Sequence, residues 1–427
     1  MDFDLVIIGG GPAGYTAGLE AVKRKLKTCI IEKTPDTLGG TCLNEGCIPL
    51  KGLLHYSEHE KDYFKIKDTV SAKVKTIRDG LRSRLKSSGI EMIEGTASFV
   101  DSSKVTVSGR EITAKNFLIA CGSVPKKIFD SEKVFTSEKI FSLETKPETA
   151  LIIGGGVIGC EYASFLNNIG VQVDIAEVMP SLIPGGDADV IRALEREFKK
   201  KKITLYTSSK AEISGAECVI KTAAGEVKKT YSIIIEATGR RAAIEGLNLD
   251  AAGVKLTPKG FIETDSSLRT TKDNIFAAGD CIDTPMLAYT AYKEAETAVK
   301  AVCGEEIRPI GYASMPMLVF SMPQAGSIGL SEETAKNEGM NITVKKYFFK
   351  AIGKAVVESN DAGFLKLIID EKGVIAGAAA CGGSIAELMN ELAVIVKNKL
   401  TVKQIEETTH IHPSYGEIVL EALMYGA

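Results

Sequence analysis

The chain has 427 residues, which is too long for one ordinary hydrophobic core and predicts two or three domains. Apolar residues make up 44% and charged residues 25%, as in an ordinary globular protein, and a net charge of −3 argues against nucleic acid as a partner. No apolar run reaches the roughly 18 residues of a transmembrane helix, so we expect no membrane span.

The N-terminus reads MDFDLVIIGGG, with two acidic residues and no basic segment. It is not a signal peptide, so we expect a cytoplasmic protein. In a reducing compartment, single cysteines in apolar runs are expected to be free core residues. Five of the nine cysteines fit this description: Cys29, Cys160, Cys218, Cys281 and Cys303.

The first predicted elements form a complete βαβ fingerprint. An apolar strand, a glycine-rich turn, a helix and a second strand with an acidic end follow one another: Leu5 to Ile8, then Gly9, Gly11 and Gly14, then Thr28 to Ile31 and Glu32. Glycines at this spacing allow a tight turn, backbone approach to a pyrophosphate and close packing of helix on strand. The acid is expected to bind ribose hydroxyls, so the segment predicts a dinucleotide site.

Two thiols follow in GGTCLNEGCIP, residues 39 to 49. Cys42 and Cys47 are compatible with a structural disulfide, half of a metal site or a redox pair, and in a reducing compartment such a pair is more often catalytic. The apolar pattern after them predicts a helix whose N-terminus would lower a thiol pKa. His55 and His59, expected on one helix face, are the candidate second half of a zinc site, but the fingerprint in the same domain favours redox chemistry.

A second fingerprint spans residues 150 to 177, with Gly154, Gly156 and Gly159 before a helix and a strand, Val171 to Ala176, that ends at Glu177. An acid at this place favours a free ribose 2′-hydroxyl and repels a 2′-phosphate, so we predict NAD rather than NADP. Two dinucleotide sites in one chain predict two redox carriers that exchange hydride.

Three further strand ends are weaker signals: FLIACGS (117 to 123), IIIEATGR (233 to 240) and NIFAAGDCID (274 to 283), the last containing Asp280. Acids at the carboxyl end of a parallel strand face the ligand crevice, although each segment also fits a plain buried strand. The basic run Lys199 to Lys202 is expected to be a solvated helix end.

The C-terminal stretch of the chain alternates strand-like runs, Phe364 to Ile369 and Val374 to Ala380, with a helix-like run, Ile385 to Lys397. This predicts an α+β domain. Near its end, His412 is a candidate base for a thiol and Glu417 a candidate to orient the ring, while an interface histidine is the alternative.

These motifs, from Val6 to about Ala422, resemble the flavin-dependent pyridine nucleotide–disulfide oxidoreductases, and among them the branch that oxidises dihydrolipoamide. GGTCLNEGCIP and HIHPSYGE (410 to 417) carry most of the resemblance. It implies an α/β fold with two Rossmann-like domains, for FAD and NAD, and a C-terminal α+β dimerisation domain. We expect the FAD domain at 1–142 and 265–310, the NAD domain at 143–264 and the dimerisation domain at 311–427.

The resemblance also implies the site. Cys47 would face the flavin, Cys42 would exchange with the substrate, and Lys51 would stabilise reduced flavin while paired with Glu161. His412 and Glu417 would act on the disulfide of the other subunit, so a monomer should be inactive, and His410 would be a structural neighbour. The implied FAD residues are Gly9, Gly11, Gly14, Glu32, Gly40, Thr41, Lys51, Ala97, Gly122, Asp280 and Ala288, and those for NAD are Gly154, Gly156, Gly159, Glu177 and Gly239. No metal is implied. The chain departs from the family pattern at Leu50 and Cys121.

The implied reaction oxidises dihydrolipoamide. Because the first predicted strand starts almost at residue 1 and no lipoyl-type domain precedes it, we expect the lipoyl group on a separate carrier protein of a 2-oxoacid dehydrogenase, glycine cleavage or acetoin cleavage complex. An NADH-dependent reductase of another small disulfide is the nearest alternative. A mercuric reductase or a thioredoxin reductase with a C-terminal redox tail would need cysteines after Cys381, and the sequence has none there. A flavin-dependent binding protein would need neither the thiol pair nor His412.

Overall fold

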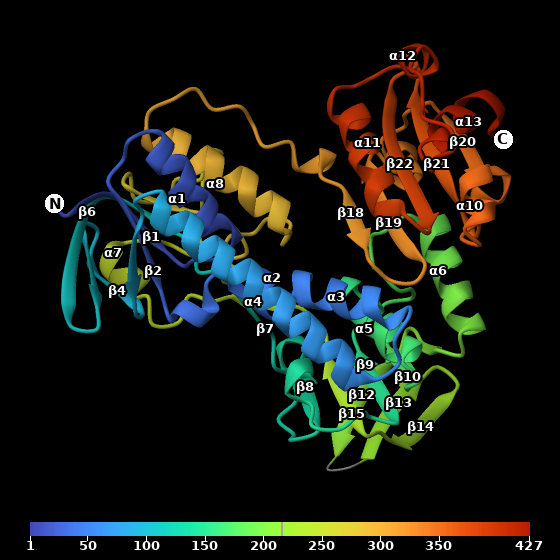
Figure 1. Ribbon diagram of the computed structural model, residues 1–427, viewed down its shortest axis with the longest axis horizontal. Helices are drawn as coiled ribbons and strands as arrows, with labels where there is room; N and C mark the ends of the chain where they lie inside the picture. Colours follow the sequence, from blue (N-terminus) through green and yellow to red (C-terminus); the bar gives the residue numbers. More distant parts are fainter. Residues whose placement is uncertain (215–216) are drawn as a thin grey trace.

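The computed structural model describes residues 1–214 and 217–427. Three lobes, each built around a sheet, lie around a centre that the long helix α4 (Tyr63–Ser87) crosses (Figure 1). The first lobe holds the N-terminus, and the third holds the C-terminus.

The sheet of the first lobe has the parallel order β3-β2-β1-β6, with β17 also paired to β6 and with β5 and β4 continuing as antiparallel strands. Its elements and the helices beside it are β1 (Phe3–Ile8), α1 (Pro12–Lys23), β2 (Thr28–Glu32), β3 (Glu91–Glu94), β4 (Ala97–Asp101), β5 (Lys104–Val107), β6 (Arg110–Ile119), α7 (Leu249–Ala252), β17 (Ile275–Ala277) and α8 (Ala288–Val302). Helices α1 and α8 pack side by side (Figure 1). Strand β1 is apolar along most of its length because it is buried in the middle of a parallel sheet.

The sheet of the second lobe is parallel throughout, in the order β11-β10-β9-β15-β8, with an antiparallel three-stranded sheet beside it. Its elements are β8 (Val134–Thr136), β9 (Thr149–Ile153), α5 (Val157–Asn168), β10 (Gln172–Ala176), α6 (Ala188–Lys200), β11 (Thr204–Tyr206), β12 (Lys210–Ser214), β13 (Glu217–Thr222), β14 (Gly225–Thr230) and β15 (Ile233–Glu236). Strand β8 belongs to this sheet although the expected boundary at 142 put it in the first domain. The domain boundaries themselves stay a prediction.

The sheet of the third lobe is antiparallel, in the order β18-β19-β22-β21-β20. Its elements are β18 (Met317–Val319), β19 (Gln324–Gly329), α9 (Glu332–Asn337), β20 (Ile342–Phe348), α10 (Gly353–Val357), β21 (Gly363–Asp370), β22 (Ile375–Gly382), α11 (Ile385–Lys397), α12 (Val402–Glu406) and α13 (Glu417–Tyr425). The predicted helix 385–397 is confirmed as α11. Two lobes with parallel sheets followed by an α+β lobe confirm the predicted fold class.

Helices α2 (Gly40–Asn44) and α3 (Cys47–Ser57) lie where the three lobes meet. The buried side chains of α3 share one hydrophobic core with Ile152 of the second sheet and Phe364 of the third. Leu50 belongs to this core and is almost fully buried, which explains an apolar residue before Lys51. Burial therefore fixes α3 against the second and third lobes.

One expectation about α3 is wrong. The helix ends at Ser57, so His59 lies beyond it and does not share a helix face with His55. The Nζ atom of Lys61 donates to the Ser57 carbonyl at 2.5 Å, which satisfies a carbonyl that a longer helix would have used. The paired-histidine half of a zinc site is therefore not formed.

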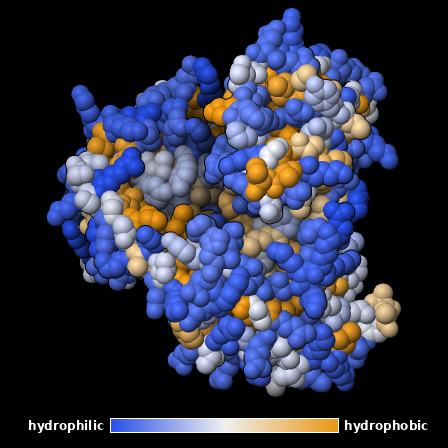
Figure 2. Space-filling model, turned by 45° about the vertical axis from the view of Figure 1, so that its right-hand side comes forward, coloured by the Kyte–Doolittle hydropathy of each residue, from blue (hydrophilic) through white to orange (hydrophobic). Residues whose placement is uncertain are grey.

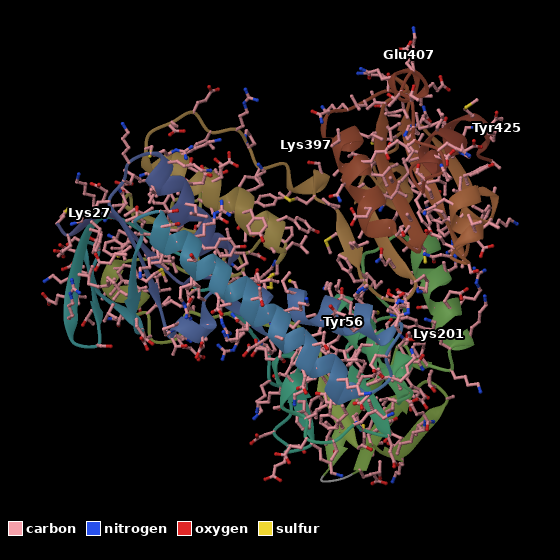
Figure 3. All side chains as sticks on the ribbon, in the orientation of Figure 1. Lys27, Tyr56, Lys201, Lys397, Glu407 and Tyr425 are labelled. Atoms are coloured by element: carbon pink, nitrogen blue, oxygen red, sulfur yellow. The ribbon has the colours of Figure 1, made fainter. Side chains whose placement is uncertain are left out.

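The surface of the third lobe exposes many large apolar side chains (Figure 2). They include Phe348, Val357, Ile411, Met424 and Tyr425. Tyr425 projects from the end of α13 at the outer edge of the molecule (Figure 3). Among the described residues, no helix is long and apolar enough to cross a membrane.

Candidate active site

The first glycine turn links β1 to α1, and neighbouring backbone atoms leave no room for side chains at two of its glycines. Gly9 has a φ of +106°, and a Cβ there would lie 2.4 Å from the carbonyl oxygen of Ala120. A Cβ on Gly14 would lie 1.8 Å from the Gly9 carbonyl oxygen. The Oε2 atom of Glu32 accepts a hydrogen bond of 2.6 Å from the Gly10 amide. Since Gly11 caps α1 without a side-chain bond, the helix N-terminus stays free for phosphate.

The second glycine turn, between β9 and α5, repeats this geometry. Gly154 has a φ of +107°, and a Cβ there would lie 2.4 Å from the Ala237 carbonyl oxygen. A Cβ on Gly159 would lie 2.0 Å from the Gly154 carbonyl oxygen. A Cβ on Gly156 would meet nothing within 4 Å, so this residue borders open space where a phosphate can approach. Glu177 accepts a hydrogen bond of 2.6 Å from the Gly155 amide.

The turn that carries the thiols lies directly against the first cradle. Gly40, at the start of α2, has a φ of +62°, and a Cβ there would lie 2.8 Å from the Gly11 Cα. Cys42 and Thr41 lie in α2, while Cys47 is the first residue of α3. The close approach of two glycines thus brings the thiols next to the predicted flavin site.

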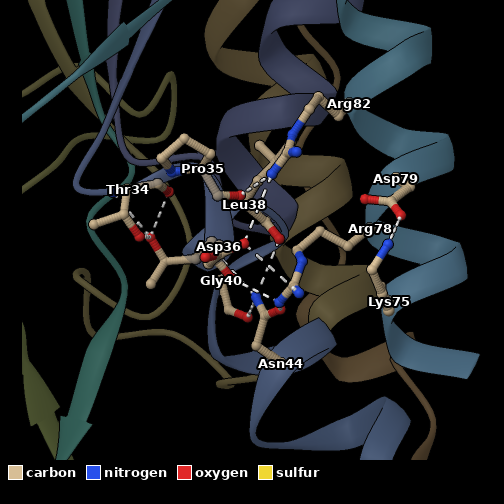
Figure 4. A network of polar contacts seen from close by, with 11 residues as sticks. Thr34, Pro35, Asp36, Leu38, Gly40, Asn44, Lys75, Arg78, Asp79 and Arg82 are labelled. Carbon is tan, nitrogen blue, oxygen red and sulfur yellow. Dashed lines mark hydrogen bonds and ion pairs between the residues drawn. The ribbon is translucent and has the colours of Figure 1, made fainter. Parts of the chain in front are cut away.

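A polar network fixes this turn from outside (Figure 4). The side-chain amide of Asn44 donates to the carbonyls of Thr37, Leu38 and Gly40 at 3.2, 3.1 and 2.9 Å. Arg78 of α4 donates to the Asn44 Oδ1 atom at 2.9 Å. The long helix therefore holds the segment that carries Cys42.

The two thiols are free and electrostatically different. A hydrogen bond from Cys42 lowers the pKa of Cys47 to about 7, with burial opposing this shift and the Lys51 ammonium adding to it. The same bond, together with burial, raises the pKa of Cys42. The N-terminus of α3 also favours negative charge at Cys47. Cys47 is therefore the sulfur that carries charge near neutral pH.

Lys51 lies one helical turn after Cys47 and is paired with Glu161 of α5. Its Nζ atom is 2.7 Å from Oε2 and 2.9 Å from Oε1 of the carboxylate. The Glu161 side chain is only 1% exposed. The structure thus brings together two predicted residues that lie 110 positions apart in the chain.

Residues from the three strand ends that the sequence marked only weakly are joined by one chain of hydrogen bonds. The Ser123 hydroxyl donates to Asp280 Oδ2 at 2.7 Å, and the Nε atom of Arg240 donates to the Ser123 hydroxyl at 2.7 Å. Gly122 and Gly239, at φ of +70° and +117°, make the turns that place them. A polar edge of this kind fits the hydroxyl groups of a dinucleotide.

Two other predicted cofactor residues stand near this edge. Ala288 begins α8, whose Glu294 accepts a hydrogen bond of 2.7 Å from the Gly279 amide beside Asp280. Ala97 begins β4 and is buried. The Gly95 amide donates to the Glu32 carbonyl at 2.9 Å, which brings the segment before β4 to the end of β2.

Cys121, where the chain departs from the family pattern, lies beside a second thiol. A hydrogen bond with the Cys121 sulfur, together with burial, raises the pKa of Cys281. Cys281 is a fully buried residue, as predicted from its apolar surroundings.

His412 and Glu417 lie in the loop before α13 and at its start. Nδ1 of His412 is 2.8 Å from Glu417 Oε1, and the Ser414 amide donates to Oε2 at 2.7 Å. The bond from Ser414, and after it the contact with His412, lowers the pKa of Glu417. The His412 side chain is 80% exposed, so it points into solvent rather than packing on the thiols of its own chain. His410 instead contacts Glu391 at 2.7 Å.

Sequence reasoning missed three aromatic residues of this region. The Phe320 ring lies under the Lys51 ammonium, whose nitrogen is 4.9 Å from the ring centroid. The hydroxyls of Tyr15 and Tyr292 are 2.9 Å apart, between α1 and α8. Burial, and to a lesser degree the Cys42 sulfur, raise the pKa of Tyr292. No motif marks these residues, because only the packing of distant segments gives them their neighbours.

Comparison with known proteins identifies the family. The profile for pyridine nucleotide-disulphide oxidoreductase matches residues 3–295, and that for the dimerisation domain of the same family matches residues 315–423. The chain is 33% identical to a dihydrolipoyl dehydrogenase of Bacillus subtilis (strain 168) over 99% of this chain and 96% of that protein. A dihydrolipoyl dehydrogenase of Chlorobaculum tepidum is 36% identical, over 98% of this chain and 96% of its own length.

Among solved structures, the HOCl-induced flavoprotein disulfide reductase RclA from Escherichia coli superposes with a TM-score of 0.92, at 26% identity over 99% of both chains. The two glycine cradles, the thiol turn and the Lys51–Glu161 pair fit this chemistry. The chain therefore belongs to the pyridine nucleotide-disulphide oxidoreductase family, as an oxidoreductase whose cofactors are FAD and NAD(H).

Proposed function

We propose that this enzyme oxidises dihydrolipoamide to lipoamide with NAD as the final acceptor. The observation that carries the proposal is the thiol pair, in which Cys47, with its lowered pKa, lies one helical turn from the Lys51–Glu161 ion pair. Relatives named dihydrolipoyl dehydrogenase at 33% and 36% identity support this choice of substrate.

The thiol chemistry uses the residues of this chain. In the oxidised enzyme, a substrate thiolate attacks Cys42 of a Cys42–Cys47 disulfide, and Cys47 leaves as a thiolate. The second substrate thiol attacks the sulfur of the first, which releases Cys42 and forms lipoamide. Overall, dihydrolipoamide and NAD⁺ give lipoamide, NADH and a proton. FAD held at the first cradle would supply the transfer of the electron pair from the Cys42–Cys47 dithiol to NAD, which would restore the disulfide.

Two charged pairs serve these steps. Lys51, held by Glu161, favours the Cys47 thiolate. His412 takes the proton of the substrate thiol, and Glu417 orients its ring and stabilises the imidazolium.

His412 acts in a dimer. Its side chain is 80% exposed at the end of the third lobe, next to apolar surface residues such as Ile411, and a match to a dimerisation domain covers this region. We propose that a homodimer buries this surface and brings His412 to the thiols of the partner subunit. The lipoyl group then comes from a separate carrier protein of a 2-oxoacid dehydrogenase, glycine cleavage or acetoin cleavage complex.

The coenzyme is NAD in this proposal because Glu177 follows β10 at the second cradle. Its carboxylate accepts from the amides of Gly155 and Met179 at 2.6 and 2.7 Å, so it is held where a 2′-phosphate would be repelled.

The deciding experiment is an anaerobic reduction of the purified flavoprotein with dihydrolipoamide, followed by NAD. We expect a long-wavelength absorption band of a thiolate beside flavin, and then NADH. Cys42→Ser should retain flavin and NADH-driven reduction of artificial acceptors while losing lipoamide turnover, and His412→Gln should lose most of that turnover. Near-full lipoamide turnover by His412→Gln would contradict the role of this residue.

A second candidate is an NADH-dependent reductase of another small disulfide, favoured by the structural similarity to a flavoprotein disulfide reductase at a TM-score of 0.92. The same experiment separates the two. A band formed with NADH but not with dihydrolipoamide would favour the second candidate and direct the search to other disulfides.

A further inference from the structure

Phe320 belongs to the third lobe of the molecule but reaches the redox site. It follows β18 in the turn that leads to β19. Its amide donates to Glu161 Oε1 at 3.0 Å, and the Met322 amide donates to the Ser164 hydroxyl at 3.1 Å. Glu161 and Ser164 lie one turn apart on α5, so two bonds fix the turn that carries Phe320 to this helix.

The same residue contacts both members of the ion pair. Its backbone binds Glu161, and its ring centroid lies 4.9 Å from the Lys51 Nζ atom. The ring face attracts a cation within about 6 Å, most strongly where the cation is partly removed from water. Lys51 is 29% exposed, so part of its hydration is already replaced by Glu161 and the ring.

The position of the Lys51 ammonium matters for Cys47. The two residues are four apart on α3 and therefore lie on one helix face. A lysine side chain has several rotatable bonds, so without lateral support its ammonium can turn toward solvent while remaining near a carboxylate. Glu161 restrains it from one direction, and Phe320 restrains it from another.

We propose that Phe320 is a positioning residue for the redox centre, which through its ring and its amide keeps the Lys51 ammonium beside Cys47. The inference rests on the proposed thiol–flavin chemistry but does not depend on which thiol is the substrate. The third lobe then serves two redox centres: Phe320 acts at the centre of its own chain, and His412 at that of the partner subunit.

The test measures the protonation of Cys47 rather than turnover. Holoenzyme is reduced anaerobically with NADH, and the long-wavelength thiolate band is recorded against pH. Phe320→Leu keeps apolar volume but removes the ring, and we expect it to raise the midpoint by about 0.5 pH unit, the shift that corresponds to one partly exposed cation–π contact. Phe320→Tyr retains the ring face and should restore the wild-type midpoint.

Phe64→Leu is the matched control. It removes a ring that also lies near a lysine, 5.9 Å from Lys67 Nζ, but on α4. We expect its midpoint to equal that of the wild type. If Phe320→Leu does not fold, fluorinated phenylalanine is placed at position 320. Fluorination weakens the negative electrostatic potential of the ring face at nearly constant shape, so the same rise in midpoint is expected.

An unchanged midpoint in Phe320→Leu or in the fluorinated variant, with a normal band, would overturn the inference while leaving the proposed function intact. A wild-type enzyme without any band after NADH reduction would overturn the thiol–flavin chemistry and this inference with it. A normal band in the wild type with no response to dihydrolipoamide would reject only the proposed substrate.

Discussion

The two dinucleotide cradles are nearly identical in their turns and different in their surroundings. Gly9 and Gly154 have φ values of +106° and +107°, and Glu32 and Glu177 each accept a glycine amide at 2.6 Å. The first turn, however, is covered by Gly40 of the thiol segment, whereas the second borders open space at Gly156. The local sequence therefore sets the turn, and neighbouring segments determine what chemistry takes place beside it.

The second cradle is also followed by a helix that contacts the third lobe of the molecule. Helix α6, which follows it, is joined to the third lobe through Lys366 of β21. The Lys366 ammonium is 2.7 Å from Asp187 and 3.3 Å from Asp189, and it also contacts Glu332. The first cradle thus contacts the thiol segment through its glycine backbone, whereas the second is joined to the thiol helix through the Lys51–Glu161 pair and to the lobe that matches a dimerisation domain through Lys366.

The largest effect should come from closing each cradle separately. Gly9→Ala places a Cβ 2.4 Å from the Ala120 carbonyl oxygen and Gly154→Ala places one 2.4 Å from that of Ala237. Backbone strain costs about 1–3 kcal/mol, and the overlap of the new Cβ with a backbone carbonyl oxygen adds to this cost, so we expect the dinucleotide to be lost almost completely. Gly9→Ala should be purified with little flavin, while Gly154→Ala should keep flavin and lose NADH binding.

Gly80→Ala serves as the control for these variants, because a Cβ there meets nothing within 4 Å on an exposed helix. Flavin content and NADH affinity are the measurements. Loss of flavin from Gly154→Ala as well would show that the two cradles are not independent.

The next largest effect, on the free energy of unfolding, should come from breaking the contact between α6 and the third lobe. Lys366 is only 2% exposed, so Lys366→Met leaves the buried carboxylate of Asp187 without its cation. Removing one partner of a buried pair costs about 3–5 kcal/mol. Denaturant unfolding should show this loss, whereas Lys75→Met, whose partner Asp79 is exposed, should change stability little. Equal stability of the two variants would contradict the role of Lys366.

A smaller effect on dinucleotide binding should distinguish the roles of Glu32 and Glu177. Glu32→Gln and Glu177→Gln each remove the charge from a hydrogen bond of 2.6 Å, which is worth roughly 1.5–3 kcal/mol. We expect weaker flavin binding in the first variant and weaker NADH binding in the second, each by about tenfold or more. Glu177→Gln should also accept NADPH better, because a 2′-phosphate no longer meets a carboxylate. An unchanged ratio of NADH to NADPH use would restrict Glu177 to holding the turn.

The smallest effect is the pH response of the thiol segment beside the first cradle. Because the pKa of Cys47 is lowered to about 7, its thiolate should predominate above that pH and be protonated below it. The rate of Cys47 alkylation, followed by peptide mass spectrometry, should therefore rise through pH about 7. Lys51→Met should move this rise to higher pH, since the lysine charge lowers the pKa. A rise at the ordinary thiol pH in the wild type would contradict the proposed environment.

Much of the fold could be predicted because its signals are local. The apolar strand before Gly9, the glycine spacing and the helix at 385–397 each follow from neighbouring residues, and all three are present in the structure. His59 shows the limit of such reasoning. Its spacing from His55 fits a helix, but the helix ends at Ser57, where the Lys61 side chain binds the carbonyl.

The candidate site divides in the same way. The thiols, Lys51 and the acids at the strand ends carry recognisable motifs, and the family resemblance implied the pairing of Lys51 with Glu161 that the structure shows at 2.7 Å. Phe320 has no motif, and although the strand ends that hold Ser123, Arg240 and Asp280 were each recognisable as weak signals, nothing in the sequence indicated the hydrogen bonds that join them. These contacts join segments more than 100 residues apart.

Short-range signals alone specified the two cradles and the thiol turn, because steric limits on glycine and the spacing of apolar residues act over a few positions. Two properties instead arose from tertiary packing: the burial of Leu50 and the place of Phe320 under Lys51. The physical reason is that charge stabilisation and burial depend on every atom within a few ångströms, and around α2 and α3 those atoms come from all three lobes.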